Sequence, residues 1–316
     1  MIESHSPQKR LYDYFRIARF DHWIKQLFVL PGVFFAWALT GGIIQNFVQI
    51  ILSFFSTSFI ASANYVINEW LDANNDKFHY EKKNRAVASR NLKTKYIIFE
   101  YLVFALLGIL ISICISRAVL ILELCLLLMG IVYNVRPIRL KEFPYIDVIS
   151  ESINNAIRLL IGWFTITSLF LPPISIILGY WFGGAFLMAV KRFSEYRSIS
   201  DKTKAALYRK SFKYYNEKIL LISAVLYALL SVFFCGIFLI KYRIELLIAV
   251  PFLCGLFCVY LNISFKNDSA AQKPEKIYKE KFLIVYLIFF IFLIYILTSV
   301  NIPSLYNMLE TTLIMA

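Results

Sequence analysis

The feature that most constrains this chain is a succession of long apolar stretches, each long enough to cross a lipid bilayer. A transmembrane helix needs roughly 20 predominantly apolar residues. Stretches of this kind occur at about residues 26–44, 47–70, 96–116, 118–135, 145–167, 172–190, 218–240, 244–263 and 282–300. Only 17% of the residues are charged, which is too few for an ordinary soluble domain. The sequence therefore predicts an all-α integral membrane protein with nine transmembrane helices.

The basic residues are unevenly distributed over the loops between these stretches. If alternate loops share a side, one side carries 29 of the 33 Lys and Arg residues, in the N-terminal segment and loops 77–95, 136–141, 191–218 and 266–281. The other side holds only Arg117, Lys241 and Arg243. Cytoplasmic loops are enriched in Lys and Arg. We therefore expect an odd number of spans, a cytoplasmic N-terminus and cytoplasmic active-site loops 77–95, 136–141 and 191–218.

The net charge of +13 is thus concentrated on one face of the predicted bundle. Part of it is ordinary charge bias and attraction to anionic lipid. Nucleic-acid binding is a poor interpretation because the sequence contains no separate soluble basic region. We predict a single transmembrane catalytic domain over residues 1–316, and the sequence does not indicate its oligomeric state.

The end of the second stretch carries polar residues four positions apart, at Asn64, Asn68, Asp72 and Asp76. This spacing places them on one face of a helix. Like charges four apart destabilise a helix when no cation lies between them. Oxygen ligands with positions left open for water and phosphate suit Mg²⁺. We expect Asn68, Asp72 and Asp76 to bind catalytic Mg²⁺, with Mn²⁺ as a substitute, and the metal to hold a diphosphate. The alternative is a solvated helix end without function.

A basic segment follows, with the sequence His79-Tyr-Glu-Lys82-Lys83-Asn-Arg85. A basic loop beside an acidic helix can hold a phosphate whose metal lies on that helix. We expect Lys82 and Arg85 to bind substrate phosphate. We interpret Lys83 and Arg90 as charge bias without a further role.

The pattern Asn68-x-x-x-Asp72-x-x-x-Asp76 resembles the first aspartate-rich motif of the UbiA superfamily of intramembrane prenyltransferases. The resemblance covers most of residues 16–215. It includes Arg19-Phe-Asp-His-Trp23-Ile-Lys25, which is similar to the R-P-x-Q-W-x-K of one branch. Further matching positions are His79, Lys82, Arg85, the run from Tyr133 to Lys141, Pro144 and Asp147. The resemblance implies nine helices around a central cavity, cytoplasmic motifs, a catalytic role for Asp147, and substrate contacts from Lys25, Tyr133 and Lys141.

The end of the sixth stretch differs between branches of this superfamily. Most members carry a second aspartate-rich motif there, which binds a second Mg²⁺, whereas this chain has Lys191-Arg192-Phe-Ser-Glu195. A pair of cations would bind phosphate directly, without metal. The segment resembles the G-K-R-x-x-E of decaprenyl-phosphate phosphoribosyltransferases, and Arg209-Lys-Ser-Phe-Lys-Tyr-Tyr resembles the R-x-x-L-x-x-Y of the same branch. We therefore expect Lys191, Arg192 and Glu195 to contact the substrate.

The fifth stretch is unusually polar, with Asp147, Glu151, Asn155 and Arg158 along one helical face. An Arg at the bilayer centre costs about 2.5–3.5 kcal/mol, so Arg158 has to face the bundle interior and a partner there. Its place resembles the S-G-F-x-L-R-A motif of the phosphoribosyltransferase branch. Two interpretations remain open: an ion pair with an intramembrane carboxylate, or a contact to a phosphate or sugar hydroxyl of the substrate. We expect the substrate contact.

These features predict a membrane glycosyltransferase, more narrowly a pentosyltransferase, of a bacterial inner membrane with its active site facing the cytoplasm. It would transfer a 5-phosphoribosyl group from phosphoribosyl diphosphate to a decaprenyl-like polyprenyl phosphate for cell-envelope glycan synthesis. A UbiA-type prenyltransferase with an aromatic or lipid acceptor is the first alternative, and Lys191 and Arg192 argue against it. A membrane transporter is the second, although the sequence has no inverted repeat.

Overall fold

The structure, a computed structural model, describes residues 7–41, 47–78, 82–89, 92–266, 269–272 and 274–305. All regular structure within these ranges is helical. The α-helices are α1 (Pro7–Ile17), α2 (Leu30–Thr40), α3 (Phe47–Asp76), α4 (Ala86–Ser89), α5 (Thr94–Ile113), α6 (Arg117–Asn134), α7 (Ile146–Ile166), α8 (Ile174–Ser198), α9 (Lys202–Tyr208), α10 (Glu217–Tyr242), α11 (Val250–Ile263) and α12 (Lys281–Ser299). The 3-10 segments are η1 (Phe20–Val29), η2 (Lys82–Asn84), η3 (Leu140–Glu142), η4 (Lys210–Lys213), η5 (Ile244–Ala249) and η6 (Pro274–Lys279).

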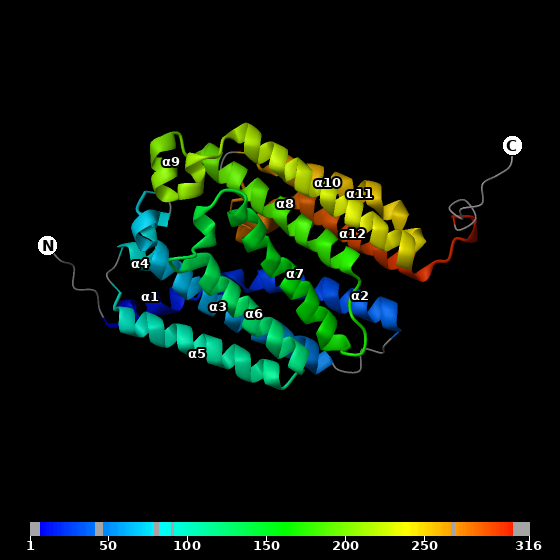
Figure 1. The fold of residues 1–316 in the computed structure, drawn as a ribbon, viewed down its shortest axis with the longest axis horizontal. Coiled ribbons are helices and arrows are strands. Elements are labelled where there is room, and N and C mark those ends of the chain that lie inside the picture. The colour runs from blue at the N-terminus through cyan, green and yellow to red at the C-terminus, as the bar shows by residue number, and fades with distance from the viewer. Residues whose placement is uncertain are drawn as a thin grey trace.

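The long helices lie side by side in one elongated bundle (Figure 1). Eight segments of the described chain are long and apolar enough to cross a membrane: Tyr12–Thr40, Phe47–Asp76, Thr94–Ile113, Arg117–Asn134, Ile174–Ser198, Glu217–Tyr242, Ile244–Ile263 and Lys281–Ser299. Each coincides with one of the predicted stretches. The predicted all-α membrane fold is therefore confirmed, and the chain is a multi-pass membrane protein.

The remaining predicted stretch, residues 145–167, forms the 21-residue helix α7. It is absent from the eight apolar segments because its charged and amide side chains lower its mean hydropathy. It packs against α2, α3, α6 and α8, so neighbouring helices surround it. Polar side chains of a helix in this position are shielded from lipid. A total of nine spans stays a prediction.

The first membrane segment differs from the continuous helix predicted at residues 26–44. Residues Phe20–Val29 form the 3-10 segment η1, and the regular helix α2 begins only at Leu30. Pro31 lies in the first turn of α2, where its missing N–H removes no helical hydrogen bond. Gly41 ends α2 at φ 62°, a left-handed conformation that glycine adopts without strain. The segment that carries Lys25 is therefore part of a break in the helix.

Two glycines allow α7 to approach η1 and α2 at backbone contact. A Cβ on Gly32 would lie 1.9 Å from the carbonyl oxygen of Leu159, and one on Gly162 would lie 2.0 Å from that of Val29. Small residues permit such close packing of membrane helices. The contact fixes the register of α7 against η1, and it thereby sets which side chains of these two segments meet.

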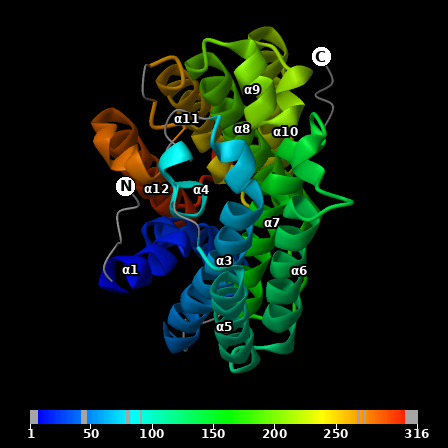
Figure 2. The same cartoon turned by 90° about the vertical axis from the view of Figure 1, so that its left-hand side faces the viewer.

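The helices α3, α6 and α8 end on the same side of the bundle, where α4 and α9 lie (Figures 1 and 2). Contacts of α3 with α4 and α9, and of η3 with η4, join the segments there. We call this side, which carries the described parts of loops 77–95, 136–141 and 191–218, the basic end. Three loops far apart in the sequence are thus brought to the end of α3.

Candidate active site

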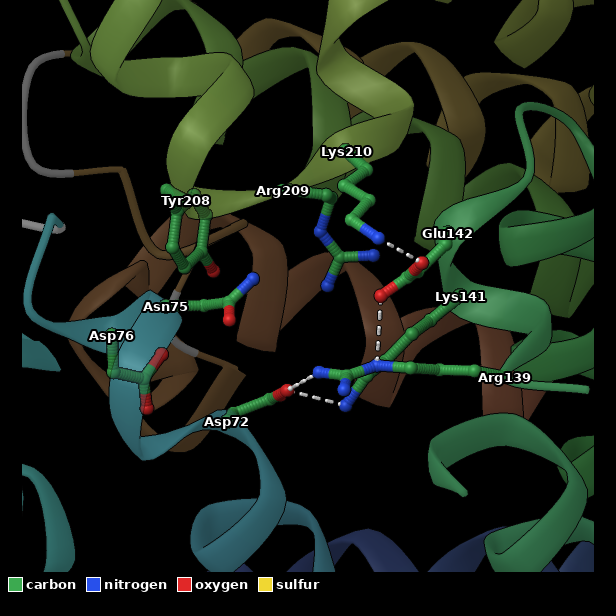
Figure 3. Close-up of a pocket in the computed structure, with 9 residues that line it drawn as sticks. All are labelled: Asp72, Asn75, Asp76, Arg139, Lys141, Glu142, Tyr208, Arg209 and Lys210. Carbon is green, nitrogen blue, oxygen red and sulfur yellow. Dashed lines mark hydrogen bonds and ion pairs between the residues drawn. The ribbon is translucent and has the colours of Figure 1, made fainter. Parts of the chain in front are cut away.

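A pocket of about 330 Å³, including open space at its mouth, lies at the basic end. Side chains from the end of α3, the segment after α6 and the α9–η4 segment surround it (Figure 3). The lining residues are Asp72, Asn75, Asp76, Arg139, Lys141, Glu142, Tyr208, Arg209 and Lys210. Three of them, Asp72, Asp76 and Lys141, are residues that the sequence analysis proposed for the site.

Asp72 lies between two cations on one wall of the pocket. Lys141 Nζ is 2.5 Å from Asp72 Oδ1, and Arg139 Nη2 is 2.9 Å from the same oxygen. The second oxygen, Oδ2, accepts one hydrogen bond, of 3.3 Å from Asn68 Nδ2, within the described chain. Burial lowers the pKa of Lys141 to about 8, against the opposing effect of the Asp72 charge. Asp72 thus keeps one carboxylate oxygen without a cationic partner.

Asn134, the last residue of α6, links two of the predicted site residues. Its Oδ1 accepts hydrogen bonds from Asn68 Nδ2 at 2.5 Å and from Lys141 Nζ at 2.7 Å. Its own Nδ2 donates to the carbonyl oxygen of Gly130 at 2.8 Å. The sequence analysis missed Asn134, although a polar residue directly after Tyr133, at the end of an apolar helix, was a usable signal.

Asp76 is buried and paired with Arg85. Arg85 Nη1 lies 2.5 Å from Asp76 Oδ2. Burial would lower the pKa of Arg85, but the charges of Asp76 and Glu69, with Tyr208 and the hydrogen bond to Asp76, together outweigh burial and raise the pKa. Arg85 therefore stays charged beside the pocket. The side chain of Lys82, and the residues His79 and Arg90, lie outside the described residues.

The oxygen groups on the α3 side of the pocket match the preferences of Mg²⁺. Asp72, Asn75 and Asp76 supply two carboxylates and an amide, and Mg²⁺ takes few protein oxygens while keeping water or phosphate in its other positions. Within the described chain no three His, Cys, Asp or Glu residues cluster for a metal, so this set depends on amides as well. Asn68 does not line the pocket, whereas Asn75, three residues after Asp72, does. The sequence analysis selected residues four positions apart and therefore missed Asn75.

Arg192, at the end of α8, is buried among three carboxylates. Its Nε lies 3.4 Å from Asp147 Oδ2, its Nη1 lies 3.3 Å from Glu195 Oε2, and its Nη2 contacts Glu151 Oε2. We call Asp147, Glu151 and Glu195 the carboxylate cluster. Tyr133 donates its hydroxyl to Glu151 at 2.8 Å and accepts from Arg192 at 3.1 Å. The protein itself thus neutralises this guanidinium.

Lys191 is a further cation beside the carboxylate cluster. Lys191 Nζ lies 3.6 Å from Glu151 Oε1. Side chains of the cluster differ in exposure: Glu151 is 25% exposed, whereas Asp147 and Glu195 are buried. Glu151 is therefore the member of the cluster that a ligand can reach.

Asp147 joins α7 to the α9–η4 segment. Its Oδ1 accepts a hydrogen bond of 2.7 Å from the Tyr215 hydroxyl, and its Oδ2 accepts one of 3.1 Å from Ser211. Arg209 Nη1, 3.4 Å from Oδ2, lies between this carboxylate and the pocket. Asp147 therefore holds a pocket-lining arginine in place. The sequence resemblance pointed to Arg209 but not to Ser211.

Lys25 and Arg158 are two further predicted residues that do not line the pocket. Lys25, on η1, has its Nζ 3.0 Å from His22 Nδ1. Arg158, in the middle of α7, donates to Gln26 Oε1 at 2.7 Å and to Asn155 Oδ1 at 3.2 Å. Among the described residues no carboxylate lies within ion-pair distance of Arg158, so its partners are neutral amides.

The sequence matches the profile of the UbiA prenyltransferase family over residues 28–294. A comparison with curated proteins found no match. Among solved structures, a UbiA homologue from Archaeoglobus fulgidus bound to DMAPP and Mg²⁺ has a TM-score of 0.67 at 22% identity, covering 92% of this chain and 100% of that chain. The same homologue bound to GPP and Mg²⁺ has a TM-score of 0.66 at 21% identity, covering 91% and 100%. A digeranylgeranylglyceryl phosphate synthase has a TM-score of 0.61 at 18% identity, covering 90% and 98%. These likenesses show a shared fold.

Proposed function

The chain belongs to the UbiA prenyltransferase family, and we propose that it transfers a 5-phosphoribosyl group from phosphoribosyl diphosphate to a polyprenyl phosphate. The observation that carries this proposal is the charge of the site. Four cations line the pocket: Arg139, Lys141, Arg209 and Lys210. The donor carries a 5-phosphate that a prenyl diphosphate lacks, and the acceptor brings a further phosphate. Three carboxylates, Asp72, Asp76 and Glu142, also line the pocket, which leaves a surplus of one cation before any metal binds. A lining that stays positive suits ligands with several phosphate groups.

A second observation supports the same donor. Lys191 and the buried Arg192 occupy the region where the sequence resemblance leads one to expect a second group of metal-binding aspartates. The carboxylates nearby are already paired with Arg192. One metal at Asp72 and Asp76, with cations in place of a second metal, is the arrangement that we propose.

Mg²⁺ held by Asp72 and Asp76, with Asn68 or Asn75, would neutralise charge on the diphosphate leaving group. A. fulgidus homologues of this fold have been solved with Mg²⁺ and with Cd²⁺, which supports a divalent metal in this family. Lys141 and Arg139 hold Asp72 at one oxygen and direct positive charge into the pocket. We assign Lys82 and Arg85 to the diphosphate.

The proposed reaction is a single displacement at C1 of the ribose. An oxygen of the acceptor phosphate forms a bond to C1 while the bond from C1 to the diphosphate oxygen breaks, and pyrophosphate leaves. The acceptor is already an anion and needs no strong base. Positive charge that develops at C1 is stabilised by a nearby carboxylate, for which Glu151 is the exposed candidate. Asp147 holds Arg209 and Glu195 holds Arg192. In this proposal the two arginines in turn orient the substrate phosphates.

We further propose that the basic end faces the cytoplasm of a bacterial inner membrane and that residues 1–316 act as one catalytic domain. The excess of Lys and Arg on this side supports the orientation. A water-soluble sugar donor then reaches the pocket from the cytoplasm, while the polyprenyl acceptor stays in the bilayer. Lys25 and Tyr133 remain assigned to substrate binding in this proposal.

Prenyl transfer from a prenyl diphosphate to an aromatic or lipid acceptor is the second candidate. The observation that favours it is the likeness in fold to homologues bound to DMAPP or GPP with Mg²⁺. It would use the same first metal site at Asp72 and Asp76. It assigns no substrate phosphate to Lys191, Arg209 or Lys210, whose described contacts include the carboxylates of Glu151, Asp147 and Glu142.

The two candidates are separated by one assay on purified protein in detergent. Protein with Mg²⁺, a polyprenyl phosphate and radiolabelled phosphoribosyl diphosphate is expected to release pyrophosphate and to carry label into the lipid fraction. EDTA, Asp72→Asn and Asp76→Asn should each abolish this, while the surface variant Lys266→Gln should not. If the label stays in the aqueous fraction while a prenyl diphosphate and an aromatic acceptor react, the second candidate replaces the first.

A further inference from the structure

Arg158 differs from the other cations of the site because the protein does not neutralise it. It lies near the middle of the 21-residue helix α7. Its guanidinium contacts the side-chain oxygens of Gln26 and Asn155, at 2.7 and 3.2 Å. No ion pair involves Arg158 in the described part of the chain. Arg158 is half-buried, and a cation in the interior of a membrane bundle is normally paired, because an unpaired one there is costly. This one is held in position while its charge is left uncompensated.

The unused polar groups around Arg158 are hydrogen-bond donors. Both amides present their oxygens to the guanidinium, so their NH₂ groups point elsewhere. Gln26 is fully buried, and its Nε2 has no hydrogen-bond partner. Arg158 Nη2 makes no hydrogen bond among the described residues. Buried polar groups such as Gln26 Nε2 are rarely left unpaired, whereas Arg158 is half-buried and its Nη2 is open to a ligand. Donors beside an uncompensated positive charge match an anion.

Among the described residues, two carboxylates lie nearby but make no ion pair with Arg158. Glu123 on α6 accepts a hydrogen bond from Thr57 at 2.6 Å with Oε1, while its Oε2 has no hydrogen-bond partner within the described chain, and Glu151 contacts Arg192 and Lys191. Both act on Arg158 only at longer range. The phenol groups of Tyr65 on α3 and Tyr180 on α8 are its other electrostatic neighbours. Side chains from η1, α3, α7 and α8 thus converge on this position in the bundle interior.

The close contact of Gly32 with α7 and of Gly162 with η1 makes this arrangement rigid. Because the backbones touch there, Arg158 cannot shift relative to Gln26 without moving a whole helix. Groups that are held in place before a ligand arrives bind it with less loss of entropy. The packing therefore prepares an anion site rather than a flexible surface charge.

Arg158 lies seven residues after Glu151, on the same face of α7. Two helical turns separate them by about 10 Å, in the direction away from the basic end. Arg158 therefore lies deeper in the bundle than Glu151, farther from the basic end where the pocket lies.

We propose that Arg158, Gln26 and Asn155 bind a phosphate monoester group, and that in the reaction this is the phosphate of the polyprenyl acceptor. The assignment to the acceptor rests on the proposed function. In a displacement at C1, the attacking oxygen approaches from the side opposite to the leaving diphosphate. With the diphosphate in the pocket at the basic end, the attacking phosphate lies on the membrane side of the sugar, towards Arg158. The 5-phosphate of the donor has the same chemistry, so the test distinguishes these two sources.

The first test uses Arg158→Gln in lipid nanodiscs, without any donor. The probes are a short prenyl phosphate and the corresponding prenol, which share a chain and differ in the phosphate. We expect the variant to bind the prenyl phosphate about 10- to 100-fold more weakly, because a charged hydrogen bond to a buried anion is lost. Binding of the prenol should stay unchanged. Equal affinities of wild type and variant for the prenyl phosphate would overturn the proposal.

The second test uses Gln26→Glu, which keeps Arg158 and supplies the carboxylate that the site lacks. The new ion pair should leave the melting temperature equal or higher, yet weaken prenyl phosphate binding at least about 10-fold, because the carboxylate occupies the guanidinium. If Arg158 only stabilises the fold, this variant binds prenyl phosphate as the wild type does, and the proposal fails. The new ion pair should both stabilise the fold of Gln26→Glu and block the binding of prenyl phosphate. This variant therefore remains informative if Arg158→Gln misfolds.

Steady-state kinetics separate the sources of the phosphate. A rise in KM for the polyprenyl phosphate, with KM for phosphoribosyl diphosphate unchanged, supports the acceptor. A rise in KM for the donor alone overturns the assignment to the acceptor. If the wild type transfers no phosphoribosyl group but binds prenyl phosphate through Arg158, the proposed function fails while the phosphate site stands.

Discussion

Two arginines inside the same bundle are held in opposite ways. Arg192, near the basic end, contacts three carboxylates and a tyrosine hydroxyl. Arg158, in the middle of α7, contacts two neutral amides. Carboxylates both orient a guanidinium and cancel its charge, whereas amides orient it and leave the charge in place. The difference teaches that a buried cation can serve as a structural centre or as a ligand site, according to the charge of its partners.

The two positions also differ in what their loss would leave behind. Removal of Arg192 takes away the cation that contacts all three carboxylates of the cluster, although Asp147 keeps Arg209 and Glu151 keeps Lys191. Removal of Arg158 leaves two amides, which are polar but uncharged. Uncompensated buried charge is far more costly than an unpaired amide. The stability of variants is therefore a direct way to test the comparison.

The largest expected effect is that of Arg192→Gln. It should lower the free energy of unfolding by about 3–5 kcal/mol, the usual cost of breaking a buried ion pair from one side. Arg158→Gln should lower it by less than about 1 kcal/mol, because the lost hydrogen bonds are offset by the removal of an uncompensated charge. Thermal unfolding in detergent measures both. Similar losses for the two variants would remove the distinction between the sites.

A double-mutant cycle with Glu151→Gln is expected to give the next largest effect. Glu151 and Arg192 are in contact, so the two changes should couple by about 1–3 kcal/mol, with Glu151→Gln recovering part of the stability lost in Arg192→Gln. Glu151→Gln combined with Arg158→Gln should be additive within about 0.5 kcal/mol. Strong coupling in the second cycle would mean that Glu151 compensates Arg158 after all.

Tyr215→Phe should have a smaller effect at the edge of the carboxylate cluster. It removes the hydrogen bond to Asp147 and the one that the Tyr215 hydroxyl accepts from the Tyr145 backbone N–H, and each should cost about 0.5–1.5 kcal/mol in the free energy of unfolding. Tyr227→Phe is the matched control, since the Tyr227 hydroxyl makes no hydrogen bond among the described residues. If Tyr215→Phe and Tyr227→Phe have the same free energy of unfolding, the hydrogen bond from Tyr215 to Asp147 does not stabilise the protein.

The smallest effect is expected for Lys266→Gln, which sets the baseline of the series. Lys266 Nζ lies 2.6 Å from Glu280 Oε2, but the lysine side chain is 53% exposed. Exposed ion pairs contribute little, so the loss should be about 0.5 kcal/mol or less. If this surface change matched Arg192→Gln or exceeded it in thermal unfolding, burial would not be what separates the ion pairs of this protein.

The sequence by itself determined the membrane class, the position of the spans and the acidic face of α3. These are local properties, because hydropathy belongs to a stretch of chain and a spacing of four belongs to one helix. The charged residues of α7 and the cations Lys191 and Arg192 could be recognised in the sequence for the same reason, because they too are local features of one segment. The breaks at η1 before Pro31 and at η5 before α11 were not predicted, since a 3-10 segment has the same hydropathy as an α-helix.

The tertiary structure decided which side chains meet. Asn134 beside Lys141, and Ser211 and Tyr215 beside Asp147, join segments that no periodicity connects. Sequence patterns left two partners open for Arg158, and the structure gives it amides from Asn155 and from the distant Gln26. That pairing depends on the contact of Gly32 and Gly162 with neighbouring backbone, which sets the register between two helical segments. Packing across helices, unlike hydropathy along one, is fixed only when the whole bundle has formed.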